Sequence, residues 1–159
     1  MAGVMVKLDA KSVVDTLARV EEGAWLNRAL NVGGLRMRGM QLQHFELAGD
    51  ADGVPWPLRK AMVVKGKYHP LLVLTARLRN SIKHRGYRDT AGNAIIEVFT
   101  NVVYAPAHQF GTETIPRRQF MYLRPSERQS LLNIYADMLR RALASKTASY
   151  GAGGIRNGN

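Results

Sequence analysis

Two stretches of the chain carry apolar residues at helical spacing, and they limit the possible folds more than any other feature. The first stretch begins at Trp25, and its stripe recurs at steps of four and three: Leu26, Leu30, Gly33, Met37, Met40, His44 and Leu47. This spacing predicts a helix with one buried face, and we expect it to be the longest helix of the chain. The second stretch keeps the same spacing, and Ser126 with Gln129 forms a capping box at its head: Leu131, Ile134, Tyr135, Met138, Ala142 and Leu143.

A pair of adjacent glycines, Gly33 and Gly34, lies inside the first helical stretch. Each glycine costs about 1 kcal/mol relative to alanine in a helix interior, so the pair needs a structural reason. A kink or a close crossing with another helix would supply one. Beyond the stretch, residues 48–57 are rich in glycine, proline and aspartate. This turn chemistry separates a helical N-terminal part from a strand-rich remainder.

Several shorter segments have the patterns of strands. Residues 4–8 alternate as in a short strand, and a capped helix is expected after them, with its apolar positions at residues 13–20. Residues 81–88 and 94–100 are β-prone and flank a loop that contains glycine and asparagine, so they predict a hairpin. The apolar run 71–74 fits either a buried strand or the lead-in to a helical turn.

The segment after the hairpin is predicted to hold a short helix, a loop and a strand. Residues 102–111 predict a short helix ended by Gly111, and the arginine-rich residues 112–119 predict a loop. We expect residues 120–123 to form a closing strand. Residues 145–159 have too few apolar groups to offset the entropy of ordering, so they predict a tail that is flexible or held by a partner.

The combined patterns predict one α+β domain over residues 1–144. Residues 1–47 are expected to be mainly helical, and residues 52–144 to form a small, mostly antiparallel sheet with the C-terminal helix packed on it. The 46% share of hydrophobic residues is enough for a buried core. The tail of residues 145–159 extends from this domain.

The net charge of +11 predicts an acidic partner, which can be nucleic acid, a membrane surface or an acidic protein face. No acid occurs between Asp52 and Asp89, and this basic window, residues 59–88, contains nine cations: Arg59, Lys60, Lys65, Lys67, Arg77, Arg79, Lys83, Arg85 and Arg88. Such a run is often an ordinary solvated face. Aromatic residues lie among these charges. They are equally compatible with base stacking on nucleic acid and with a subunit interface.

The sequence lacks the residue spacings and motifs that are typical of enzyme active sites. The chain has no cysteine, and its four histidines lack the helical spacing of a zinc site. No nucleophile elbow, phosphate-binding loop or dinucleotide fingerprint is present. We therefore expect no catalytic residue, no metal and no cofactor. No stretch approaches the ~18 apolar residues that span a bilayer, so we expect no membrane contact.

Four blocks, taken in their order and spacing, resemble the phage virion morphogenesis family, the tail-completion proteins of Mu-like and P2-like tailed phages. The blocks are Asp52–Leu58, Leu74–Ser81, Thr100–Gly111 and Ile115–Phe120. The resemblance implies that the motif positions within them have structural roles: Gly53, Trp56, Leu78, Ser81, Asn101, Tyr104, His108, Gln109, Gly111, Pro116 and Phe120.

Physical chemistry suggests what some of these residues do. Trp56 can fold back as a hydrophobic plug. Tyr104 and His108 share a helix face and can hold the short helix to the hairpin by buried hydrogen bonds. Arg117 and Arg118 are harder to explain as supports of the fold, so we expect them, with the basic window, to meet an acidic neighbour across an interface.

The resemblance also implies a non-enzymatic virion protein that assembles in the host cytoplasm. It implies a homo-oligomeric ring, expected to be a hexamer, at the tail end or the head-to-tail junction. The implied partners are the chain itself and tail-tube or neck and connector proteins, with DNA contact in the lumen as an open possibility. A protein that binds DNA through residues 59–88 is the alternative.

Overall fold

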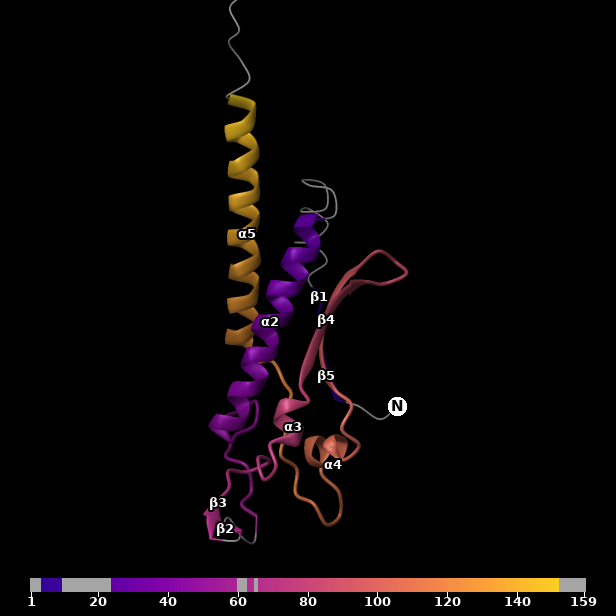
Figure 1. Cartoon of the computed structure of the whole chain (residues 1–159), viewed down its shortest axis with the longest axis vertical. Coiled ribbons are helices and arrows are strands. Elements are labelled where there is room, and N and C mark those ends of the chain that lie inside the picture. The colour runs from indigo at the N-terminus through magenta and orange to yellow at the C-terminus, as the bar shows by residue number, and fades with distance from the viewer. Residues whose placement is uncertain (1–3, 10–23, 60–62, 65, 152–159) are drawn as a thin grey trace, which may run out of the picture.

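The computed structural model describes residues 4–9, 24–59, 63–64 and 66–151. Its main elements form three layers, which Figure 1 shows side by side. Helix α5 (Pro125–Gly151) packs against helix α2 (Ala24–Leu47), and α2 lies across a three-stranded antiparallel sheet. The predicted α+β class is confirmed, although α5 packs mainly against α2 and not on the sheet itself.

The sheet has the strand order β1-β5-β4, with β1 at Val4–Asp9, β4 at Lys83–Arg88 and β5 at Ala94–Thr100. Both neighbours of β5 are antiparallel to it. The predicted N-terminal strand and hairpin are therefore confirmed. The helix expected at residues 13–20 lies outside the described residues.

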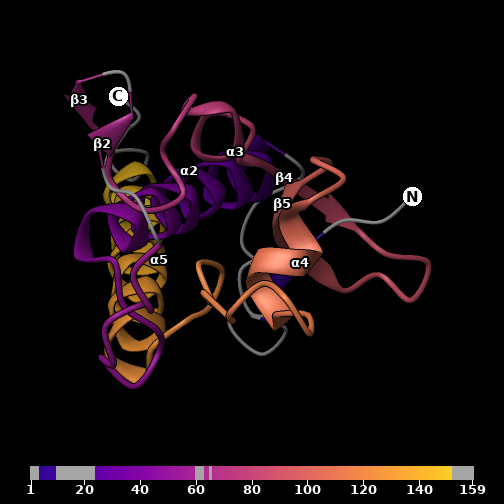
Figure 2. The ribbon, with the colours of Figure 1, turned by 90° about the horizontal axis from the view of Figure 1, so that it is seen from below.

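Small elements and loops complete the fold at the lower end of Figure 1, and Figure 2 shows this end of the molecule from below. They are the two-stranded hairpin of β2 (Val63–Val64) and β3 (Lys67–Tyr68), and the short helices α3 (Arg77–Asn80) and α4 (Ala105–Phe110). The run 71–74 is a turn that leads into α3, so the second of its two predicted alternatives is correct. The short helix ended by Gly111 is confirmed as α4.

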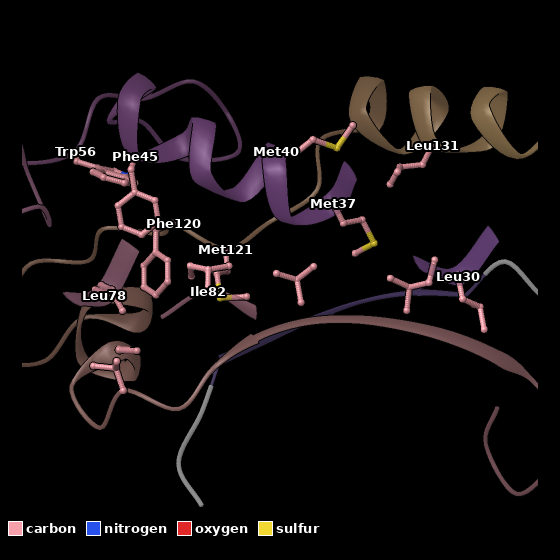
Figure 3. Close-up of a cluster of buried hydrophobic side chains, with 14 of the residues drawn as sticks. Leu30, Met37, Met40, Phe45, Trp56, Leu78, Ile82, Phe120, Met121 and Leu131 are labelled. Atoms are coloured by element: carbon pink, nitrogen blue, oxygen red, sulfur yellow. The ribbon is translucent and has the colours of Figure 1, made fainter. Parts of the chain in front are cut away.

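The hydrophobic core runs between the layers and continues beyond the sheet (Figure 3). Met37 on α2 and Leu131 on α5 are fully buried, and Ile96 on β5 faces α2. At the C-terminal end of α2 the core becomes aromatic, because Phe45 packs against Phe120 with ring centroids 5.4 Å apart. Full burial of a side chain such as Phe120 contributes about 1.5–3 kcal/mol.

The glycine pair of α2 is explained by contacts on two sides. A Cβ atom on Gly33 would overlap the hydroxyl of Tyr135 on α5, and a Cβ atom on Gly34 would overlap the imidazole of His84 on β4. The two glycines therefore let both neighbouring layers approach the helix backbone. The prediction of a close crossing is confirmed, and the sheet as well as a helix makes the approach.

Helix α5 differs from its predicted boundaries at both ends. It begins at Pro125, and the backbone N–H of Arg124 donates to Oε2 of Glu127 over 2.8 Å. The predicted capping box of Ser126 and Gln129 is therefore wrong, because Glu127 supports a helix start that precedes Ser126. Proline is well suited to the first helical position because its missing N–H would have no partner there.

The C-terminal end of α5 also lies later than the sequence indicated. The helix continues to Gly151, so it spans 27 residues against 24 for α2, and the expectation that the first stretch forms the longest helix is wrong. Residues 145–150 contain alanine and lysine, and an existing helix propagates through such residues at little cost. Residues 152–159, the rest of the predicted tail, lie outside the described residues.

The predicted closing strand at residues 120–123 is wrong. These residues pair with no strand in the described part of the chain, and polar side chains bond to their backbone groups instead. Gln41 of α2 accepts from Tyr122 N over 3.0 Å and donates to Tyr122 O over 2.8 Å. No helix in the described part of the chain is long and apolar enough to cross a membrane.

Candidate partner-binding site

Four separate segments meet at the end of the molecule that carries α3 and α4 (Figures 1 and 2), and we call this region the motif corner: residues 52–58, 74–81, 100–111 and 115–122. Hydrogen bonds join them in pairs. Trp56 Nε1 donates to Gln119 O over 3.0 Å, and Arg118 Nε donates to Pro57 O over 2.8 Å. The hydroxyls of Ser81 and Thr100 lie 2.6 Å apart. The corner is therefore one connected unit.

Gln109 on α4 provides the central support of the motif corner. Its Oε1 accepts from the backbone N–H groups of Phe120 and Met121, each over 3.1 Å, and its Nε2 donates to Met121 O over 2.8 Å. The side chain is buried, so water does not replace these bonds if the amide is lost. The Gln109 side chain thus supplies the hydrogen bonds that a neighbouring strand would supply to these backbone groups in a sheet.

The opposite side of the loop is held by α2 and α5. His44 Nε2 lies 2.7 Å from Glu127 Oε1, and its ring stacks on Tyr122 at a centroid distance of 3.7 Å. Arg124 lies against the face of Tyr122 and donates to the carbonyl of Asp50 over 3.1 Å. These contacts fix the loop relative to the two long helices and to the turn that follows α2.

A cavity of about 330 Å³ opens at the motif corner between the 71–75 loop, α3 and α4. Two guanidinium groups, those of Arg59 and Arg118, line it beside the imidazole of His108 and the ring of Tyr104. Burial, and then the positive charge of Arg59, lowers the pKa of Arg118. Burial, and then the charge of Arg118, lowers the pKa of His108. The cavity is therefore positive with a neutral imidazole in its wall.

The motif corner also presents apolar side chains to solvent. Leu58 is 75% exposed, Val103 84% and Phe110 71%, and Leu74 and Tyr104 are exposed as well. Clusters of large exposed apolar groups are unusual on a monomeric protein and mark surfaces that other proteins cover. The corner thus combines a rigid backbone with an apolar, positively charged surface.

A comparison with known proteins matches residues 8–140 to the phage virion morphogenesis family. The chain belongs to this family. The matched range includes all four segments of the motif corner, the whole of α2, and α5 as far as residue 140. No curated protein and no solved structure matches the chain significantly. The family places this protein in the assembly of phage particles.

The described residues of the basic window lie on several different elements of the structure. Lys67 lies on β3, Arg77 and Arg79 on α3, and Lys83, Arg85 and Arg88 along β4, which leads away from the β2–β3 hairpin (Figure 1). Lys60 and Lys65 lie outside the described residues. The interface role of these residues stays a prediction, and the described ones among them are distributed over several elements.

Arg79 and Arg85, two of the described residues of the basic window, form ion pairs with acids. Arg79 lies 3.2 Å from Glu46. Arg85 donates from Nε to the buried Glu97 over 2.6 Å, and the hydroxyl of Tyr87 donates to the same carboxylate over 2.6 Å. The hydrogen bond to Glu97 raises the pKa of Tyr87 and that of Arg85. These contacts stabilise the outer face of the sheet.

Arg117 and Arg118 differ although they are adjacent. Arg117 is exposed and donates to the side chain of Gln119 over 3.0 Å, so it is available to a partner. Arg118 is buried, and its bond to Pro57 O joins two segments of the motif corner. The expectation that Arg118 does not support the fold is therefore wrong, because loop 112–119 lacks regular structure and needs side chains to hold it.

The remaining motif residues occupy several environments. Trp56, Leu78 and Phe120 are in the core, while Gly53, Asn101 and Pro116 are exposed. Gly111 has φ 80°, and a Cβ atom there would lie 3.1 Å from Arg117 N, so the close approach of two backbones requires glycine.

The proposed hydrogen-bonding role of Tyr104 and His108 is not observed. Their rings meet edge to face at 5.9 Å, Tyr104 is exposed, and the buried Nδ1 of His108 has no hydrogen-bond partner among the residues that the structure describes. Gln109 instead attaches α4 to the loop. Sequence reasoning missed the roles of Gln41 and His44. The signal for His44 was a polar side chain within the apolar stripe of α2, and Gln41, which is also buried, lies next to that stripe.

Proposed function

We propose that this protein is a subunit of a homo-oligomeric ring, a hexamer, that completes the phage tail or joins it to the head. It acts by binding neighbouring tail-tube, neck or connector proteins and catalyses no reaction. The family supports a role in virion assembly. The observation that carries the finer proposal is the motif corner, where a rigid backbone presents exposed apolar side chains next to cationic ones.

The geometry favours binding through this corner for a physical reason. A rigid loop loses little conformational entropy when it is covered, so most of the gain from burying its apolar groups is available for affinity. An adjoining open groove of about 550 Å³ contains Leu47, Leu58 and Tyr68 and extends the apolar surface along the end of α2. Closed rings need such a surface on every subunit.

Native mass spectrometry of the purified protein and peptide mass spectrometry of purified virions test the proposal together. We expect a closed oligomer and a constant copy number per virion. Phe110→Asp and Val103→Asp should dissociate the oligomer or prevent its incorporation, because a charge on a covered apolar surface costs about 2 kcal/mol or more. Leu35→Asp is the matched control, since Leu35 is an exposed apolar residue on α2 away from the corner. A protein that is monomeric at all concentrations and absent from virions would overturn the proposal.

The alternative of DNA binding through residues 59–88 has its own test. A gel shift at low and high salt should show binding that weakens steeply with salt if phosphates are the ligands. We expect weak binding at most, because Arg79 and Arg85 are engaged by Glu46 and Glu97. Tight, salt-sensitive binding that is lost in a Lys67→Gln, Arg77→Gln variant would favour the alternative.

A further inference from the structure

The groove beside the end of α2, which we call the end groove, is lined mainly by apolar side chains. Phe45 and Trp56 line it, are both buried, and meet edge to face with ring centroids 6.1 Å apart. Leu47, Leu58 and Tyr68 also line it and are exposed. Its volume of about 550 Å³ lies within the range of sites that hold a drug-sized molecule, about 300–1,000 Å³. An aromatic and an aliphatic side chain therefore fit in it together.

Hydrogen bonds fix the walls of the end groove. The backbone N–H of Trp56 donates to Ala48 O over 2.7 Å, and its indole N–H donates to Gln119 O over 3.0 Å. On the other wall, Arg59 donates to His69 O over 2.8 Å and so joins the two ends of the segment that carries the β2–β3 hairpin. A groove whose shape is fixed in this way loses little conformational entropy when it is filled.

A second apolar surface lies on α4 and just before it, and we call it the α4 face. It consists of Val103, Tyr104 and Phe110, which are all exposed. The end groove includes Tyr68 of β3, and α4 and the β2–β3 hairpin lie apart from each other in both views of the molecule (Figures 1 and 2). Each copy of the chain thus carries two different apolar surfaces, and a contact that uses one of them leaves the other open.

The charges at the end groove leave a cation for an occupant. Among the described residues that line the groove, the charged ones are Glu46 and Arg79, and they lie 3.2 Å from each other. Lys67 is exposed beside Tyr68 on β3, and it forms no ion pair within the described part of the chain. The rim of the end groove therefore offers a positive charge.

The α4 face is accompanied by an acid. Glu113 is exposed three residues after Phe110 and is the only acid in residues 98–126. It forms no ion pair with any described residue, and Arg117, an exposed cation of the same loop, donates to Gln119. An acid near one surface and a lysine near the other are complementary if the two surfaces meet across two copies.

We propose that the end groove of one subunit receives the α4 face of a second copy of this chain. Phe110 packs against Phe45 and Trp56, and Glu113 lies near Lys67. The inference rests on the proposed function, because it names the two surfaces through which neighbouring ring subunits meet. Since these surfaces differ, the contact is heterologous, and repetition of such a contact gives a ring when its rotation closes.

Two variants with complementary defects test this contact on the full chain. Phe110→Asp disables the α4 face and keeps the end groove, and Leu58→Asp does the reverse. Each alone should lower the association constant by at least about 30-fold, because a charge is placed on a covered apolar surface. Their mixture should form a one-to-one heterodimer that does not grow, since its two remaining surfaces are disabled. Native mass spectrometry with one variant isotope-labelled measures this, and Leu35→Asp, outside both surfaces, is the control.

A charge reversal tests the predicted ion pair separately. Glu113→Lys or Lys67→Glu should weaken association by about two- to five-fold, as expected for an exposed pair. The double variant should restore it, because the pair is then reversed across the contact. Both residues are exposed, and thermal unfolding checks that each variant is folded. A double variant that associates no better than the single variants would show that these two residues do not meet.

The identity of the occupant is tested in virions. A photo-crosslinking residue at position 58 should react with residues 103–113 of a second copy. A crosslink to a different virion protein or to DNA would overturn the assignment of the occupant.

The remaining outcomes separate the contact from the closed ring. A mixture that stays monomeric, or a single variant that assembles like the unchanged protein, would reject the contact while closed rings of the unchanged protein uphold the proposed function. Open chains of the unchanged protein, with a mixture that stops at the heterodimer, would support the contact and reject the closed ring. Monomers at every concentration, with no heterodimer, would overturn both.

Discussion

The layered part of the molecule and the motif corner satisfy their buried backbone N–H and C=O groups in different ways. In the layers, α2, α5 and the sheet satisfy their backbone groups through regular hydrogen bonding, and the side chains only have to pack. In the corner, residues 120–122 belong to no helix or strand of the described chain, and their backbone groups bond to side chains, above all those of Gln41 and Gln109. Packing thus controls the first region, and a few polar side chains control the second.

This difference determines which substitutions each region tolerates. A layer responds to added volume, because its interior is close-packed on both sides of α2. The corner responds to the loss of single amide or guanidinium groups, because each one satisfies buried backbone atoms that have no other partner. The following predictions test that contrast in order of decreasing effect.

The largest effect is expected for Gln109→Leu. Its amide satisfies three buried backbone groups of Phe120 and Met121, and each orphaned group costs about 1–3 kcal/mol, so the loss should be about 3 kcal/mol or more. Urea unfolding measures it. Gln129→Leu, which removes one exposed bond to Asn133, is the control and should change stability by less than about 0.5 kcal/mol. A Gln109→Leu variant as stable as this control would contradict the role of the corner amide.

Gly33→Ala should cost about 1–3 kcal/mol, because the added methyl group overlaps Tyr135 and overpacks the layers. Gly39→Ala on the same helix has open space and should instead gain about 1 kcal/mol from helix propensity. Tyr135→Phe removes a buried hydroxyl that has no partner within the described residues and should partly restore the Gly33→Ala variant. Independent, additive effects of Gly33→Ala and Tyr135→Phe in a double-mutant cycle would show that the two residues do not touch.

A smaller effect is expected at alkaline pH. Burial raises the pKa of Tyr122 to about 12, and it raises that of Tyr135 further. Because the folded state favours the neutral phenols, their contribution to stability is fully present below pH 10 and declines as the pH rises toward the folded values. Ultraviolet difference titration should show both tyrosines ionising only together with unfolding. Ionisation of Tyr122 in the folded protein near pH 10, where a free tyrosine ionises, would contradict its burial.

The smallest effect is expected at mildly acidic pH. His108 in the corner and His84 in the layers both have pKa values lowered mainly by burial, so each is favoured in its neutral form. Their contribution to stability is present above pH 6.5 and is lost as the pH falls through the folded values. His108→Gln should therefore lose less stability between pH 7.5 and pH 5 than the parent. If stability depended on pH in the same way in His108→Gln and in the unchanged protein, His108 would not contribute to the acid sensitivity.

The sequence predicted the layers well and the motif corner poorly, and the contrast between the regions explains why. Periodicity reports which side chains are buried, and this was sufficient for α2, α5 and the β4–β5 hairpin. It does not report that Gln109 or Arg118 will satisfy a backbone group of another segment. The error at residues 120–123 has this origin, since an apolar run predicts burial but not whether a strand or a side chain supplies the hydrogen bonds.

The candidate site was predictable in its residues but not in its arrangement. The four blocks pointed to the segments that meet at the motif corner, yet the separation of Arg117 from Arg118 depends on the path of loop 112–119. The cationic cavity depends on Arg59 and Arg118 meeting across a long sequence separation. No local pattern contains that information. The basic window, in contrast, was continuous in sequence and became distributed when the chain folded.

The adjacent glycines of α2 also fix the angular setting of that helix. Successive helical residues point about 100° apart, so Gly33 and Gly34 present bare backbone to two different neighbours, α5 and β4. A rotation of α2 by one position would bring the side chain of Val32 or Leu35 into one of these contacts. The close approaches of Tyr135 and His84 to these two glycines therefore fix the angle between α5 and the sheet about α2.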